Sequence, residues 1–197
     1  MGELAELSRL ASYSITAGIL AFGLYLWRKR NEVKIWEAGI TALFSAALVL
    51  LATAVIRRPV PQTGGYLNVG DTMVMFTAMV FGPAIGAFAG GVGSAVADVV
   101  LGYSGWAPVT LLVKGLEGFV VGYASRKLEG TSGMTVAAVL GGIVMVAGYF
   151  LFEYHAFGFS PAYDELQGNI VQAVTGVIIG TGLANLVKKK FPKVGEI

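Results

Sequence analysis

Polar and ionisable residues stand in a fixed order between Gly64 and Gly118, inside segments that are otherwise apolar. Asp98, Lys114 and Glu117 are the charged members that fall within long apolar runs. A charged side chain at membrane depth is costly unless it meets a partner, water or a ligand. We therefore expect these side chains to find partners and to border a site for a small molecule.

Lys114 and Glu117 are three residues apart, so on a helix they share one face and can form an ion pair. Asp98 is a second possible partner for Lys114. A purely structural ion pair would also explain these charges, and the two interpretations stay open. We favour a mixed role for Lys114, at the border of a ligand cavity, and a mainly structural role for Glu117.

Amide and aromatic residues form a second set of candidates. Asn169 and Gln172 lie one helical turn apart, and amides offer both donors and acceptors, which suits the mixed edge of a heteroaromatic ring. These amides would equally serve to bond a neighbouring helix. The rings expected at the same depth, where they would form a stacking cage, belong to Tyr66, Trp106, Tyr154, His155 and Phe157.

The composition is that of a membrane protein. The chain is 55% hydrophobic and 13% charged, and its mean hydropathy is +0.71. It contains no cysteine and one histidine, which excludes disulfides and argues against the metal sites of intramembrane proteases. We expect no metal and no cofactor. The net charge of +2 is spread over helix ends and does not indicate a nucleic-acid partner.

Seven apolar segments are predicted to be helices, several of them near the ~20 residues that cross a bilayer. In the first, the basic cluster follows the apolar run, the reverse of a secretory signal, so we expect a retained helix. The seven segments are Leu10–Trp27, Ile35–Ile56, Val69–Phe81, Ala84–Leu101, Pro108–Tyr123, Met134–Phe152 and Gly168–Val187.

Basic residues predict the orientation in the membrane. With the loop between the first two segments in the cytoplasm, ten lysines and arginines fall inside and three outside. This places the N-terminus outside and the C-terminus in the cytoplasm. Loops carrying aromatic and polar residues then lie outside, at 57–68, 102–107 and 153–167, so we expect a ligand to approach from that side.

Small residues recur at every fourth position on two segments. Gly86, Gly90 and Ser94 form one groove, which predicts close packing of two helix backbones. Alanines 38, 42 and 46 form a second stripe, suited to a helix of this chain or of a separate protein.

The order GGYLNVGD, then FGPxxGAxAGGxGSAxAD, then WAPxTLLxKGLEG resembles the substrate-binding S components of energy-coupling factor (ECF) vitamin transporters. The resemblance covers residues 37–190 and implies a six-helix bundle with a substrate pocket near the outer face. The fold expected is an all-α polytopic membrane protein: an S-component-like bundle at 35–190, an extra N-terminal transmembrane helix with a basic loop at 1–34, and a cytoplasmic tail at 191–197.

The resemblance also implies site residues and partners. The loop at 57–68 is expected to close over the pocket, and Ala42 and Ala46 match the alanine motif that contacts the coupling transmembrane subunit. Two ATPase subunits would act through that subunit. The predicted substrate-binding residues are Tyr66, Asn68, Asp98, Trp106, Lys114, Glu117, Tyr154, His155, Asn169 and Gln172.

The predicted function is capture of a small water-soluble vitamin or precursor from outside: riboflavin, thiamine or its hydroxymethylpyrimidine, or a pyridoxine-type compound. No ATP-binding signature occurs in the sequence, so energy would come from partner subunits. A facilitator that works without ATPases and a structural subunit of a membrane complex are the alternatives. An enzyme is not expected, because no nucleophile–base constellation is found.

Overall fold

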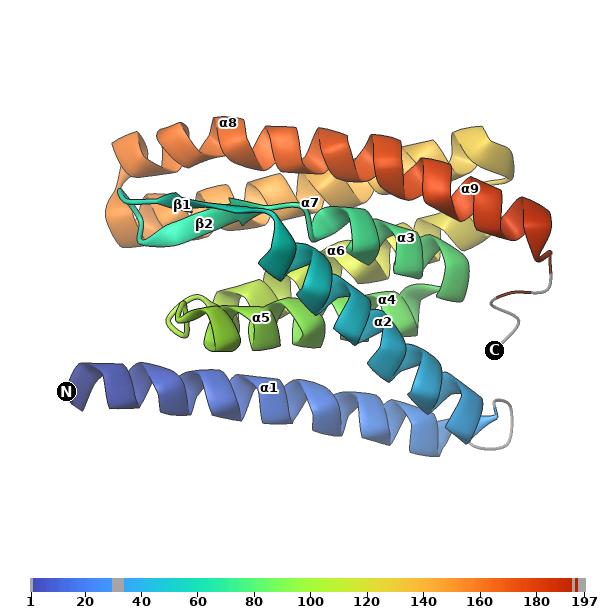
Figure 1. Ribbon diagram of the computed structural model, residues 1–197, viewed down its shortest axis with the longest axis horizontal. Helices are drawn as coiled ribbons and strands as arrows, with labels where there is room; N and C mark the ends of the chain where they lie inside the picture. The colour runs from blue at the N-terminus through green and yellow to red at the C-terminus, as the bar shows by residue number, and fades with distance from the viewer. Residues whose placement is uncertain (1, 30–33, 193, 195–197) are drawn as a thin grey trace.

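The computed structural model describes residues 2–29, 34–192 and 194, and shows a helical bundle with one short β-hairpin (Figure 1). Six described helical segments are long and apolar enough to cross a membrane, beside one shorter apolar helix. The predicted all-α polytopic membrane fold is therefore confirmed. In chain order the elements are α1 (Gly2–Arg28), α2 (Ile35–Val55), β1 (Arg57–Val60), β2 (Gly65–Asn68), α3 (Asp71–Phe81), α4 (Pro83–Phe88), η1 (Ala89–Gly93), α5 (Ser94–Leu101), α6 (Ala107–Lys127), α7 (Gly130–Phe157), α8 (Phe159–Thr175), η2 (Gly176–Gly180) and α9 (Thr181–Lys190).

Two of the membrane-spanning segments contain a π-helical turn. In the first, η1 joins α4 to α5, and in the second, η2 joins α8 to α9. Such turns are rare and often occur at functional sites. A Cβ added at Gly176 would lie 3.0 Å from both Met75 Sδ and Asp71 Cβ. Glycine at this position therefore lets η2 approach the start of α3, where Asp71 lies.

The small-residue groove on α4 and η1 packs against α6, as the sequence predicts. A Cβ at Gly86 would meet the carbonyl oxygen of Gly118 at 2.7 Å, and a Cβ at Gly90 would collide with the carbonyl oxygen of Lys114. The two backbones are in direct contact because neither glycine carries a side chain. This contact fixes the position of Lys114 within the bundle.

The segment at 57–68 is a β-hairpin and not an irregular loop. Its strands pair antiparallel, with Arg57 opposite Asn68 and Val60 opposite Gly65. Gly64 turns the chain with φ +65°, a conformation that glycine adopts without strain. The hairpin lies across one end of the bundle, beside α7 and α8 (Figure 1).

The prediction of an outer loop at 153–167 is wrong. The helix α7 continues to Phe157, Gly158 turns with φ +90°, and α8 begins at Phe159. Polar residues lower the hydropathy of this region, but Glu153 and Glu165 are buried and face the interior. Hydropathy alone does not distinguish such a polar inner face from a loop.

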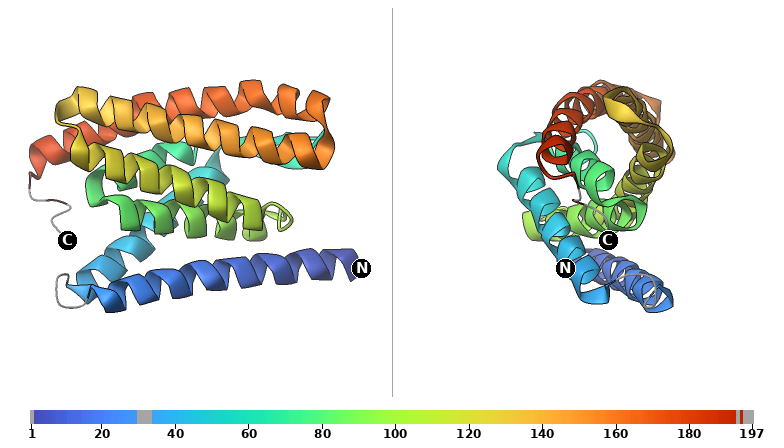
Figure 2. Two further views of the ribbon diagram at one scale, coloured as in Figure 1. Left: turned by 180° about the vertical axis from the view of Figure 1, so that it is seen from behind. Right: turned by 90° about the vertical axis from the view of Figure 1, so that its right-hand side faces the viewer.

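The central helices are α3, α4, α5 and α6, and α1 lies at the periphery (Figure 2). In the most apolar stretch of α1 only 11% of the residues are buried inside the protein, whereas 67% are buried in the corresponding stretch of Pro83–Leu101. The contacts of α1 are nevertheless specific: Ala11 is buried against Ala95 and Ala107, and the rings of Phe22 and Phe88 lie 4.4 Å apart.

The helix α1 begins at the hairpin end of the molecule, and α9 ends at the opposite end (Figure 1). The predicted basic loop at 30–33 lies outside the described residues, as do residues 193 and 195–197 of the predicted tail.

Candidate functional site

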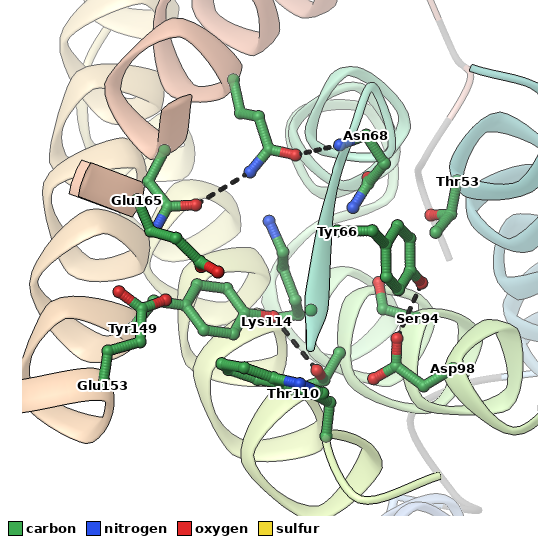
Figure 3. Close-up of a pocket in the computed structure, with 14 residues that line it drawn as sticks. Thr53, Tyr66, Asn68, Ser94, Asp98, Thr110, Lys114, Tyr149, Glu153 and Glu165 are labelled. Atoms are coloured by element: carbon green, nitrogen blue, oxygen red, sulfur yellow. Dashed lines mark hydrogen bonds between the residues drawn. The ribbon is translucent and has the colours of Figure 1, made fainter. Parts of the chain in front are cut away.

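A cavity lies at the hairpin end of the bundle, between the hairpin and the ends of α2, α5, α6, α7 and α8 (Figure 3). Most of its lining side chains are polar or aromatic. The lining residues are Thr53, Gly65, Tyr66, Asn68, Ser94, Asp98, Trp106, Thr110, Lys114, Tyr149, Glu153, Glu165, Asn169 and Gln172.

Lys114 lines the cavity, and its ammonium group is paired with two carboxylates that do not line it. Its Nζ forms an ion pair with Asp71, at the start of α3, and lies 3.3 Å from Glu117 Oε2. All three side chains are at most 3% exposed. The predicted pairing of Lys114 with Glu117 is therefore confirmed, but the second partner is Asp71 and not Asp98.

Asp98 instead holds the hairpin. The Tyr66 phenol donates a 2.7 Å hydrogen bond to Asp98 Oδ1, as Figure 3 shows. Burial, and then the negative charge of Asp98, raise the pKa of Tyr66 above its ordinary range. The phenol thus keeps its proton and remains a donor.

Two hydrogen bonds tie the hairpin to α8. The Thr63 hydroxyl donates to Glu165, and the backbone N–H of Asn68 donates to Gln172 Oε1. Glu165, Asn169 and Gln172 follow at intervals of four and three residues, so they share one face of α8. The hairpin is therefore anchored on α5 and α8, and it covers the cavity between them.

The orientation of the two amides follows from their partners. A backbone N–H can only donate, so the atom of Gln172 that faces Asn68 is the carbonyl oxygen. Gln172 Nε2 then donates to Asn169 Oδ1 at 3.1 Å. This leaves Asn169 Nδ2, a donor, without a partner among the described residues.

Aromatic rings form one wall of the cavity. The Trp106 ring centroid lies 6.2 Å from that of Tyr149 and 5.4 Å from that of Phe152. The Tyr149 hydroxyl donates to Thr110 Oγ1 at 3.2 Å. Trp106 also lines a neighbouring cavity, whose wall includes Leu7 and Ser8 of α1.

Several buried polar atoms around the cavity have no hydrogen-bond partner within the described part of the chain. Both carboxylate oxygens of Glu153, Oδ2 of Asp98 and Oγ1 of Thr53 belong to this group, beside Nδ2 of Asn169. Buried polar groups are almost always paired, so unpaired ones in a cavity mark the positions of ligand or water contacts. The arrangement is suited to binding a small polar ligand against aromatic faces.

The structure brings most of the predicted site residues together. Seven of them line the cavity: Tyr66, Asn68, Asp98, Trp106, Lys114, Asn169 and Gln172. Glu117 lies beneath it as a partner of Lys114.

Tyr154 and His155 lie outside the cavity, which corrects the prediction for both. Tyr154 is 48% exposed, and the exposed His155 lies with Nδ1 2.7 Å from the carbonyl oxygen of Leu151. Successive helix residues point about 100° apart, so with Glu153 directed inward the next two side chains point away.

Sequence reasoning missed several residues. Asp71 was overlooked as a partner of Lys114, although it ends the motif GGYLNVGD. Helical spacing indicates some of the others, because Thr110 shares one face with Lys114, and Tyr149 shares one face with Glu153. The lining residues that were not predicted are Thr53, Gly65, Ser94, Thr110, Tyr149, Glu153 and Glu165.

The alanine stripe of α2 faces inward. Ala42 is fully buried against Ile85, Phe88 and Val92, and a Cβ added at Gly93 would lie 3.1 Å from Cα of Ala46. Ala42 thus packs on α4 and η1 of the same chain, which corrects the prediction that it contacts another subunit. Ala46 is only partly buried, and its contact with a coupling subunit stays a prediction. Among the described residues, no group of three or more His, Asp or Glu side chains is arranged to hold a metal ion.

Comparisons with known proteins agree with this architecture. The chain is 47% identical over 148 residues to an uncharacterized protein of the gap 3' region of Pyrococcus woesei, covering 75% of this chain and 99% of that protein. It is 26% identical over 144 residues to the thiamine precursor transporter HmpT of Lactococcus lactis, covering 73% of this chain and 82% of the relative. The profile of the family described as ECF-type riboflavin transporter, S component, matches residues 32–189. The chain therefore belongs to the S-component family of ECF-type transporters.

Proposed function

We propose that this protein binds a small water-soluble vitamin or vitamin precursor for uptake, as the substrate-binding component of an ECF-type transporter. The observation that carries this proposal is the cavity under the hairpin, where unpaired buried polar atoms lie beside the rings of Trp106 and Tyr149. A ligand that fills this cavity would satisfy those atoms and stack on those rings.

The relatives provide two candidate ligands. The description of the matching family names riboflavin, and the name of the relative from Lactococcus lactis names a thiamine precursor. Both are planar heteroaromatic compounds. The protein would bind and release its ligand unchanged, without catalysing a reaction.

The hairpin is proposed to act as a lid. The bonds Tyr66–Asp98, Thr63–Glu165 and Asn68–Gln172 hold it over the cavity. All three join segments far apart in the sequence, so the hairpin can separate from α5 and α8 without unwinding a helix. Opening would expose the cavity to solvent.

The hairpin end is proposed to face outside, in the plasma membrane. The excess of basic residues at the other end supports this orientation, with the N-terminus outside and the C-terminus in the cytoplasm. The sequence carries no ATP-binding signature, so a coupling transmembrane subunit and two ATPase subunits would provide the energy for uptake.

Reconstitution in liposomes tests the proposal. The purified chain is expected to bind a vitamin without any other subunit, and to support accumulation only after a coupling subunit and two ATPases are added with ATP. Accumulation by the chain alone would favour a self-sufficient facilitator. Absence of vitamin binding by the folded protein would favour a structural subunit.

A further inference from the structure

The cavity carries an excess of acidic groups. Asp98, Glu153 and Glu165 line it together with Lys114, and Asp71 and Glu117 pair with Lys114 just beneath, so five carboxyl groups lie in or under the cavity against one ammonium group. Lys114 is already paired with two of them. A phosphate or carboxylate on a ligand would have to displace these partners and would meet the remaining acids at short range.

The unpaired atoms define the edge that a ligand must present. Glu153 is 1% exposed and both of its oxygens lack a donor among the described residues. The Asn169 amide, whose orientation the backbone N–H of Asn68 fixes through Gln172, offers an N–H without an acceptor. The side chains of Glu153 and Asn169 are near enough to contact each other, although no hydrogen bond of normal geometry joins them, so a ligand between them would take the place of that contact. Their complement is therefore an N–H donor next to an acceptor on one ligand edge.

The aromatic wall requires the rest of the ligand to be flat. Trp106 and Tyr149 line the same cavity, with their ring planes inclined at 56°. A planar ring that meets Glu153 with its edge can stack on one of these faces. A cationic ring would gain further, from the aromatic faces and from the surplus acids.

From these three observations we infer the chemical class of the ligand: an amino-substituted nitrogen heterocycle, neutral or cationic, without a phosphate or carboxylate group. Its amino group donates to Glu153, and the adjacent ring nitrogen accepts from Asn169 Nδ2. This inference rests on the proposed function and narrows it. The pyrimidinedione edge of a flavin also places an N–H beside an acceptor, but a flavin lacks the basic ring nitrogen that the acidic groups of the cavity favour, so the inference favours an aminopyrimidine.

Equilibrium binding to the purified full chain tests the inference. The probes are hydroxymethylpyrimidine and thiamine, which carry an amino group beside a ring nitrogen, their phosphate esters, riboflavin and pyridoxine. At least one amino compound is expected to bind, and its phosphate ester to bind about a hundredfold more weakly or not at all, because the added anion would meet several acidic groups and no free cation among the lining residues.

The variant Glu153→Gln is expected to weaken binding of the amino compound at least about tenfold, because it removes a charge-assisted hydrogen bond. The matched control is Glu129→Gln, the same change at the exposed start of α7, which is expected to leave binding unchanged.

Three results would overturn the inference while leaving the proposed function intact. These are binding of riboflavin or pyridoxine in preference to both amino compounds, binding of a phosphate ester as tight as that of its parent, and equal affinities of wild type and Glu153→Gln. If Glu153→Gln fails to fold, the ligand panel on the wild-type protein decides alone. Binding of none of the six probes by folded protein would instead contradict the inference and the proposed function together.

Discussion

The phenol of Tyr66 donates to Asp98 Oδ1 at 2.7 Å, and this bond joins β2 of the hairpin to α5. It is one of three hydrogen bonds that hold the hairpin over the cavity, and the only one of them made by a phenol. Since the raised pKa keeps Tyr66 protonated, the bond does not depend on titration of the phenol near neutral pH.

Replacement of Tyr66 by Phe is expected to accelerate ligand dissociation. A hydrogen bond to a charged group contributes about 1.5–3 kcal/mol, which corresponds to a change of about tenfold to a hundredfold in the closure equilibrium of the hairpin. Stopped-flow fluorescence measures the dissociation rate. Tyr154→Phe, outside the cavity, is the control and should behave as wild type; a rate for Tyr66→Phe equal to that control would show that this bond does not hold the lid.

Replacement of Lys114 by Met is expected to destabilise the protein strongly. It leaves the carboxylates of Asp71 and Glu117 buried without a counter-charge, a situation that costs about 3–5 kcal/mol. Thermal unfolding in detergent measures the loss. Lys127→Met, at an exposed position of the same helix, is the control. The double variant Lys114→Met, Asp71→Asn should recover part of the stability, and no recovery would argue against charge as the cause.

Replacement of Gly118 by Ala is expected to separate two packed backbones. The new Cβ would collide with the carbonyl group of Gly86, and such overpacking costs about 1–3 kcal/mol. Gly182→Ala in α9 is the matched control, because nothing lies within 4 Å of the added Cβ. Denaturation curves should show a loss for Gly118 and a small gain for Gly182, since alanine favours helix. Equal effects would contradict the close approach of α4 and α6.

Replacement of Phe22 by Ala tests whether residues 1–34 form a separate addition to the ligand-binding bundle, as proposed from the sequence. The change removes the contact with Phe88 and is expected to cost about 1–2 kcal/mol, less than for a fully buried phenylalanine. Ligand affinity should stay within about twofold of wild type, which is below 0.5 kcal/mol, because no described residue of α1 lines the ligand cavity. A large loss of affinity without unfolding would place α1 in the binding unit.

The apolar runs of the sequence predict most of the helices, and helical spacing predicts part of the site. Each membrane-spanning helix needs a long apolar run, and each run is visible as such. Lys114 and Glu117 are near in sequence, so their pairing follows from helical spacing. The pairing of Lys114 with Asp71 spans 43 residues and depends on how α3 meets α6, which spacing along one helix does not determine.

Each error arises where one sequence pattern is compatible with two different structures. Glu153 and Glu165 lower the hydropathy of helix ends that carry a polar inner face, so the region resembled a solvated loop. Ala42 belongs to a small-residue face and is buried within this chain, and the sequence pattern is the same for an internal and an external partner.

Fluorescence of Trp106 tests most directly whether the ligand binds under the hairpin. The protein has three tryptophans, and Trp27→Phe with Trp36→Phe leaves Trp106 alone. Titration of this variant with the vitamin that binds is expected to give a saturable change in emission, at the same dissociation constant as wild type, and Trp106→Phe should lose the signal. A vitamin that binds to the variant without changing the emission of Trp106 would place its site elsewhere and contradict the proposed cavity.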